Sequence, residues 1–210
     1  MKKIYLFLLV LLGFSGVINA QNDPNAKKVL DGVSNKLKTL KGVNANFSYT
    51  TKDRNNVAKG SVKGLISIKG QKYYIKQGST EIFCNGAKVW NFNGEDEVTV
   101  ADVDNEDNKT LSPQKLLTNF YDQDFTYKLV SSKGSFHEIL MIPTDKRKNF
   151  KQVTIFIDKA KSLIAKANVV DKSDNTIGFT LSNIVTNIVL PDTKFMFDAA
   201  KHPGVEVVNQ

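Results

Sequence analysis

Apolar and polar residues alternate along much of residues 43–92, and this alternation predicts a series of β-strands. In the first of them, Val43, Ala45, Phe47 and Tyr49 are apolar or aromatic, and the residues between them are polar. Because successive side chains of a strand point to opposite faces, one face of this strand is apolar.

Glycines within the same stretch predict that the sheet bends. Gly60 and Gly64 interrupt the second run, as glycines do at bulges and bends. Asn85 and Gly86 separate two further apolar runs, and an Asn-Gly pair is typical of a tight hairpin turn. We therefore expect a strongly curved antiparallel sheet whose concave face is apolar.

Two other stretches have apolar residues at helical spacing. In residues 24–41 an amphipathic pattern follows Asp23, a suitable N-cap, and Pro24, a suitable first helical residue, and it ends before Gly42. Residues 112–120 predict a second, shorter helix. Neither helix is stable alone, and the curved sheet is the surface that can cover their apolar sides.

The second half of the chain consists of further strand-like runs separated by turn signals. About eleven strands are predicted in all, with no alternation of strands and helices, no internal repeat and no linker. The expected fold is a single α+β domain, in which a large curved antiparallel sheet has two or three helices on its inner face.

Residues 1–20 predict a cleaved signal peptide rather than a part of the fold. Lys2 and Lys3 precede an apolar run at residues 4–14, and a small residue stands at the cleavage site. This run is too short for a confident membrane span. We expect an exported, soluble protein formed by residues 21–210.

The charge of the exported chain favours acidic partners. Without the leader, 27 bases and 21 acids give a net charge of +6, which suits lipid headgroups or an acidic protein, or serves solubility alone. Nucleic acid is not expected as a partner of an exported protein. Residues 95–107 hold seven acids and no base, and residues 146–151 hold four bases and no acid. We interpret both runs as solvated loops, with docking as the alternative.

Candidate chemistry is sparse. Cys84 is the only cysteine, so no internal disulfide forms, and it lies in an apolar strand where a buried thiol is expected. His137 and His202 have no metal-ligand spacing, and nucleotide-binding or nucleophile motifs do not occur. We expect a protein that is not an enzyme and that needs neither a metal nor a cofactor.

The supply of aromatic side chains suggests a container instead. Residues 21–210 include eleven Phe, five Tyr and one Trp. A curled sheet of about eleven strands encloses more space than two slim helices fill, which predicts a ligand cavity. The alternative interpretation is that the same side chains form an ordinary solid core.

Several sequence segments resemble one known family when taken in their order along the chain. They are the N-terminal helix that leads into residues 44–53, then residues 60–75, 83–92, 111–117 and 143–175, followed by the ending Phe-x-Phe…Pro-Gly-Val-Glu-Val-Val at residues 195–208. In this order, behind a leader, they resemble the periplasmic outer-membrane lipoprotein carrier family LolA.

The resemblance implies an unclosed β-barrel with helices as a lid over a hydrophobic cavity. It implies a monomeric periplasmic carrier that takes acylated lipoproteins from an inner-membrane lipoprotein-releasing transporter to the outer membrane, usually through an acceptor lipoprotein. The alternatives are a carrier of another exported lipid and an extracellular β-module with a solid core.

The resemblance and the strand pattern together nominate site residues. The residues expected to bind acyl chains are Phe47, Tyr49, Tyr73, Phe83, Trp90, Phe92, Leu116, Leu117 and Phe120, of which the last three would line the lid. Lys69 stands where the family commonly has an Arg that latches the lid. Lys lacks the planar fork of Arg, so a latch made by Lys69 would be weaker.

Overall fold

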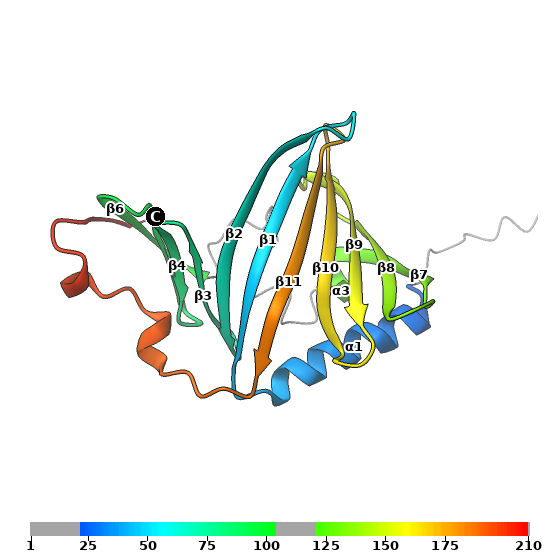
Figure 1. Ribbon diagram of the computed structural model, residues 1–210, viewed down its shortest axis with the longest axis horizontal. Coiled ribbons are helices and arrows are strands. Elements are labelled where there is room, and N and C mark those ends of the chain that lie inside the picture. Colours follow the sequence, from blue (N-terminus) through cyan, green and yellow to red (C-terminus); the bar gives the residue numbers. More distant parts are fainter. Residues whose placement is uncertain (1–21, 104–120, 210) are drawn as a thin grey trace, which may run out of the picture.

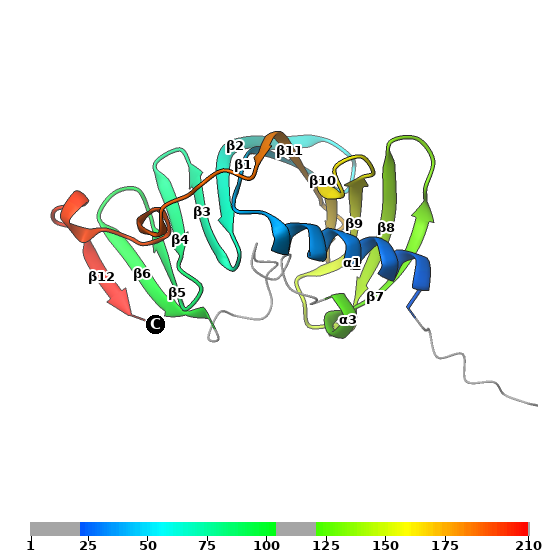
Figure 2. The same cartoon turned by 90° about the horizontal axis from the view of Figure 1, so that it is seen from below.

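The computed structural model describes residues 22–103 and 121–209. Within them, twelve strands form one sheet in the order β12-β6-β5-β4-β3-β2-β1-β11-β10-β9-β8-β7. The strands are β1 (Val43–Lys52), β2 (Ala58–Lys69), β3 (Lys72–Gln77), β4 (Thr80–Cys84), β5 (Lys88–Phe92), β6 (Glu97–Asp102), β7 (Phe125–Ser131), β8 (Phe136–Pro143), β9 (Phe150–Asp158), β10 (Leu163–Asp171), β11 (Thr176–Thr186) and β12 (Glu206–Asn209). The sheet arches over without its end strands meeting, as Figure 2 shows. The expected unclosed, curved sheet is thus confirmed.

The sheet differs from expectation at one edge. Eleven antiparallel strands were predicted, whereas β12 is a twelfth strand and pairs with β6 in parallel, with Glu206 opposite Glu97. The cause is the path of the chain after β11, which crosses the outside of the sheet and returns along its far edge (Figure 1). A parallel partner requires such a long crossover, which a meander of hairpins does not contain.

Helix α1 (Pro24–Thr39) covers one half of the inner face. The Asp23 carboxylate accepts a hydrogen bond from the Asn25 amide, as the sequence predicts for an N-cap. Ala26, Leu30 and Val33 are buried in one apolar cluster with side chains of strands β7 to β10. Figure 2 shows α1 lying across the concave side of these strands.

The end of α1 comes slightly before the position that Gly42 suggested. The helix stops at Thr39, and Leu40 is already extended. A Cβ on Gly42 would lie 2.7 Å from the Ile188 carbonyl oxygen. Gly42 therefore allows two segments to approach closely rather than terminating the helix itself.

A short helix, α3 (Tyr121–Asp124), is held against α1 by polar contacts. The Tyr121 hydroxyl donates to Asp31 at 2.7 Å, and the Lys27 ammonium donates to Asp122 at 2.7 Å. The Tyr127 hydroxyl of β7 also donates a hydrogen bond to Asp122. Burial, and secondly this hydrogen bond, raise the pKa of the Tyr127 hydroxyl to about 12. The second helix predicted from the sequence, residues 112–120, lies outside the described residues.

The C-terminal segment, residues 187–209, forms what we call the strap. It contains two 3₁₀ turns, η2 (Asp192–Phe195) and η3 (Ala199–Lys201), and ends in β12. Phe195 is fully buried, and the Phe197 ring lies 5.9 Å from Phe83 and 5.8 Å from Phe92 between centroids. The strap thereby covers the outer face of strands β3 to β6.

Candidate ligand-binding face

The strand ladders show which side chains share the inner face, because Cα partners on neighbouring strands point to the same side. Ala167 of β10 packs in the α1 cluster and pairs with Phe179 of β11. Phe179 pairs in turn with Tyr49 of β1, and Leu181 pairs with Phe47. The Phe47 and Phe179 rings are stacked, with 5.8 Å between their centroids. The apolar side of β1 therefore faces the same space as α1.

The same face continues across β3 to β5. Tyr73 pairs with Cys84, which pairs with Val89, and these three side chains form a cluster that is at most 1% exposed. Ile75 and Ile82 form the next pair along the strands. The Cys84 thiol is buried, as the sequence predicts.

Half-buried apolar side chains extend over this part of the inner face. They include Tyr49, Ile68, Ile75, Ile82, Phe179, Leu181 and Ile184, which pack against the buried clusters of β1 to β5. They come from five neighbouring strands, β11 and β1 to β4, whereas α1 packs on β7 to β10. We call these seven residues the apolar inner surface.

Six of these seven residues were not nominated from the sequence. A usable signal was present in β11, where Ile177, Phe179 and Leu181 alternate with smaller or polar residues. The alternation predicts a strand, but nothing in a single strand indicates that it lies beside β1, more than 120 residues earlier in the chain.

The nominated aromatic residues divide between the two faces. Phe47, Tyr49 and Tyr73 lie on the inner face. Phe83 pairs with Tyr74 and Trp90 on the outer face. Phe92, two residues after Trp90, lies on that face as well and packs under the strap. The structure does not bring Phe83, Trp90 and Phe92 together with the apolar inner surface.

Lys69 contacts the strap. Its ammonium donates to the Leu190 carbonyl at 2.9 Å and to the Asp192 carboxylate at 2.8 Å, and Lys72 lies 3.1 Å from the same carboxylate. These hydrogen bonds, from Lys69 first and Lys72 second, hold the pKa of Asp192 below its usual value. Lys69 thus bonds a backbone carbonyl, as a latch would, but on the outer face.

The nominated lid residues Leu116, Leu117 and Phe120 lie outside the part of the chain that the structure describes. Their place over the inner surface, and any contact between Lys69 and a lid, remain predictions.

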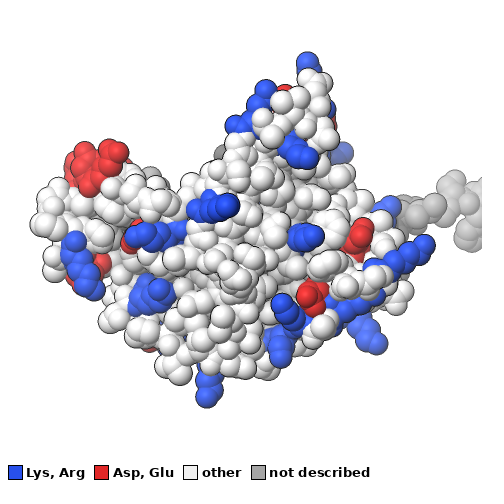
Figure 3. Space-filling model, viewed as in Figure 1, with Lys and Arg blue, Asp and Glu red and all other residues white. Residues whose placement is uncertain are grey.

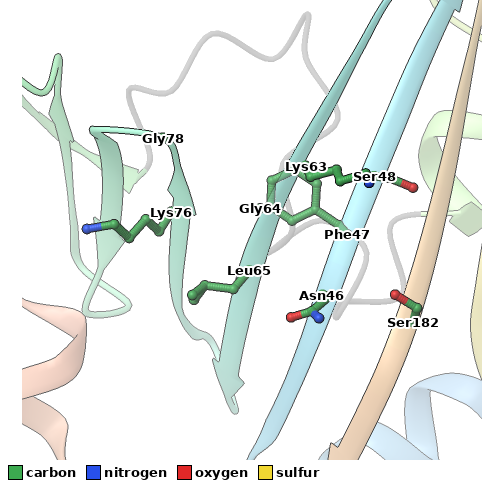
Figure 4. Close-up of a pocket in the computed structure, with 9 residues that line it drawn as sticks. All are labelled: Asn46, Phe47, Ser48, Lys63, Gly64, Leu65, Lys76, Gly78 and Ser182. Carbon is green, nitrogen blue, oxygen red and sulfur yellow. The ribbon is translucent and has the colours of Figure 1, made fainter.

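A separate hollow of about 540 Å³ opens between β1, β2 and β3 (Figure 4). Its polar lining residues come from the outer face, and Phe47, Gly64, Leu65 and Gly78 also line it; the polar ones are Asn46, Ser48, Lys63, Lys76 and Ser182. None of the seven residues of the apolar inner surface lines this hollow.

Two further properties concern the described residues only. In residues 22–103 and 121–209, no three His, Cys, Asp or Glu side chains are placed to hold a metal ion. None of the helices in this part of the chain has the length and apolar character needed to cross a membrane.

The sheet is curved and unclosed, a helix lies across its inner side, and an apolar surface lies beside that helix. These features define the class of unclosed β-barrels. The family model for outer membrane lipoprotein carrier protein LolA matches residues 38–198 of this chain. The chain belongs to the LolA family.

Solved structures share this fold at low sequence identity. An uncharacterized conserved protein from Thermus thermophilus has a TM-score of 0.57 and 11% identity, over 89% of this chain and 99% of that one. MucB has a TM-score of 0.51 and 12% identity, over 83% of this chain and 63% of MucB. Lipoprotein LppX from Mycobacterium tuberculosis has a TM-score of 0.50 and 12% identity, over 81% and 99%. The likeness concerns the fold alone, and a comparison with curated proteins gives no match.

Proposed function

We propose that this protein is a periplasmic carrier that binds the acyl chains of lipoproteins on its apolar inner surface and carries them from the inner to the outer membrane. The observation that supports the proposal is the set of seven half-buried apolar side chains on five neighbouring strands. Membership of a family described as outer membrane lipoprotein carriers supports the nature of the cargo.

The energetics of acyl chains explain why a carrier is needed. Each methylene transferred out of water contributes roughly 0.8 kcal/mol. A lipoprotein with several chains therefore faces a cost on the order of tens of kcal/mol if it crosses water unshielded. A broad surface that is only half covered can shelter the chains and still release them, because a small shift between open and closed states suffices.

Different inner residues would contact the cargo to different degrees. Tyr49, Phe179 and Leu181 are half-buried and would touch the chains directly. Phe47 and Tyr73 are 6% and 1% exposed, so they would form the floor beneath. Residues 112–120 would supply the lid, and residues 1–20 the export signal.

The proposal describes a binding protein and not an enzyme. Its partners would be the acylated lipoprotein, the inner-membrane transporter that releases it, and an outer-membrane acceptor lipoprotein. A carrier of a different exported lipid would use the same surface, and the identity of the bound material distinguishes the two.

The first test identifies and displaces the cargo. Protein purified after export is extracted, and the bound material is analysed by mass spectrometry; acylated peptides are expected. The exported protein is also titrated with a fluorescent fatty acid, which a triacylated lipopeptide should displace at one-to-one stoichiometry.

A matched pair of variants locates the site. Tyr49→Glu places a carboxylate on the inner surface and should weaken binding of the fluorescent fatty acid about 10- to 100-fold. Thr50→Glu introduces the same carboxylate one residue away on the outer face and should leave binding unchanged. Equal binding by both variants, or no binding by the unmodified protein, would contradict the proposal.

A further inference from the structure

Three connections between strands meet at one end of the sheet. They are residues 52–59, which join β1 to β2, residues 145–151, which lead from β8 into β9, and residues 171–175, which join β10 to β11. Lys52 at the end of β1 is the Cα partner of Thr176 at the start of β11, so two of these connections are adjacent. An ion pair joins the third connection, residues 145–151, to residues 171–175, since the Lys151 ammonium lies 2.6 Å from the Asp174 carboxylate. We call these three segments the basic rim.

The basic rim concentrates positive charge. Its 20 residues include eight Lys or Arg and four Asp, a net charge of +4. Figure 3 shows Lys and Arg gathered at the upper end of the molecule, over the β1–β2 hairpin, and acidic side chains gathered at the far left. The acidic residues at that edge of the sheet are Glu95, Asp96, Glu97 and Glu206. The molecule is therefore electrically asymmetric.

The four carboxylates of the rim are all engaged locally. Asp53 pairs with Lys59, Asp145 with Arg147, Asp171 with the Asn175 amide group and Asp174 with Lys151. Four cations form no ion pair with other described residues: Lys52, Arg54, Lys146 and Lys172. These cations remain available to an external anionic partner.

An apolar side chain stands among these cations. Val57 lies in the turn between β1 and β2 and is 53% exposed. At this hairpin tip its apolar side chain contributes nothing to a core. Arg54 precedes it by three residues and Lys59 follows by two. Positive charge around an exposed apolar tip is the combination that favours a membrane interface.

We propose that the basic rim docks this protein on a membrane surface that is rich in anionic lipid headgroups. The cations are spread over three separate turns rather than gathered in a pocket. Anionic lipids move laterally and can collect beneath dispersed cations, whereas a rigid acidic protein must match their positions. The acidic edge at Glu97 and Glu206 would be repelled by the same surface, which orients the molecule with the rim toward the membrane.

This orientation has a consequence for the apolar inner surface. Tyr49 lies three residues before Lys52 on β1, which at about 3.3 Å per residue places it roughly 10 Å from the rim. Its partner Phe179 lies at the same level on β11. Docking would therefore bring one end of the inner surface close to the headgroups. The inference rests on the proposed function only where it concerns the inner surface and its cargo.

Binding to vesicles tests the proposal. Exported protein is mixed with vesicles of phosphatidylcholine alone, or of phosphatidylcholine with phosphatidylglycerol, and the bound fraction is measured by sedimentation at low and high salt. We expect binding only to the vesicles that contain phosphatidylglycerol, and loss of that binding at high salt.

Charge reversal locates the docking surface. The Arg54→Glu/Lys146→Glu variant should bind these vesicles at least about 30-fold more weakly, because each basic residue near the surface contributes about fivefold. The control, Lys133→Glu/Lys161→Glu, makes the same change in total charge in the β7–β8 and β9–β10 turns, at the other end of the strands, and should bind almost as well as the unmodified protein. Thermal unfolding verifies that both variants are folded.

Three outcomes would overturn the proposal: no vesicle binding at low salt, equal binding to both kinds of vesicle, or equal loss in the rim and control variants. The first would instead favour an acidic protein as the partner of the rim. Titration with the fluorescent fatty acid separates this proposal from the proposed function, since the rim variant should bind the fatty acid normally.

Discussion

The contact between Phe47 and Gly64 shows how one residue shapes the sheet. The two are Cα partners on β1 and β2, and the Phe47 ring lies over the backbone of Gly64. A Cβ at Gly64 would overlap both this ring and the Lys76 carbonyl oxygen. The sheet can therefore place a large ring in the floor of the inner surface only because no side chain stands beneath it.

The Gly64→Ala substitution should destabilise the fold. The Lys76 backbone cannot move aside freely, so we expect a loss of about 1–3 kcal/mol in the free energy of unfolding. Gly60→Ala is the control, because nothing lies within 4 Å of a Cβ there, and it should change stability by less than about 1 kcal/mol. Urea denaturation of both variants measures the difference, and equal stabilities would refute the packing argument.

At the scale of elements, the strap is the part of the chain that joins distant segments. Lys69 and Lys72 hold Asp192, and the Lys194 ammonium lies 4.5 Å from the centre of the Tyr74 ring. Beyond these contacts the strap adds β12 to the sheet edge at β6. Its attachment thus depends on charge at one end and on backbone pairing at the other.

Acid should loosen the strap. Asp192 has a pKa below its usual 3.8 in the folded protein, so its contribution to stability is present above pH 3.8 and is lost as the pH falls through the lowered value. The protection of the β12 amides against hydrogen exchange, relative to their intrinsic rates at each pH, should therefore fall below about pH 4. Trp90, the only tryptophan, lies on the face that the strap covers, and its fluorescence offers a second measure.

The Asp192→Asn variant should show low protection of the β12 amides at every pH, and its difference from the unmodified protein should vanish in acid. Asp174→Asn removes a carboxylate from a lysine pair in the basic rim, away from the strap, and serves as the control. If it changed β12 exchange as much as Asp192→Asn, the strap would not depend on the Asp192 contacts.

At the scale of the whole molecule, the two halves of the sheet are covered differently. Helix α1 packs on the inner side of β7 to β10, and the strap packs on the outer side of β3 to β6. The apolar inner surface lies beside the part that α1 covers, on β11 and β1 to β4, and on the face opposite to the strap. Its side chains are only partly buried, so a ligand that packed on them would complete the core.

A ligand that completes the core should stabilise the folded state. An acylated lipopeptide at about 100 times its dissociation constant should add about 2.7 kcal/mol to the free energy of unfolding, seen as a higher Tm. The same peptide without acyl chains should have no effect, and Tyr49→Glu should largely abolish the shift. A shift produced by the unacylated peptide would place binding elsewhere than on the inner surface.

The sequence alone determined the local features of this protein. Alternation in residues 43–92 predicted strands with an apolar face, Asp23 and Pro24 predicted the start of α1, and the buried Cys84 followed from its apolar strand. These features depend on residues close together in the chain, which is why a periodic pattern is sufficient to find them.

Only the tertiary structure decided which faces meet. In β4 and β5 both faces are apolar, so the pattern could not show that Cys84 and Val89 point inward while Phe83 and Trp90 point outward. The parallel β12, the bonds from Lys69 to the strap and the gathering of three turns into one basic rim join residues far apart in the chain. Such contacts arise from the path of the folded chain, and no local periodicity encodes that path.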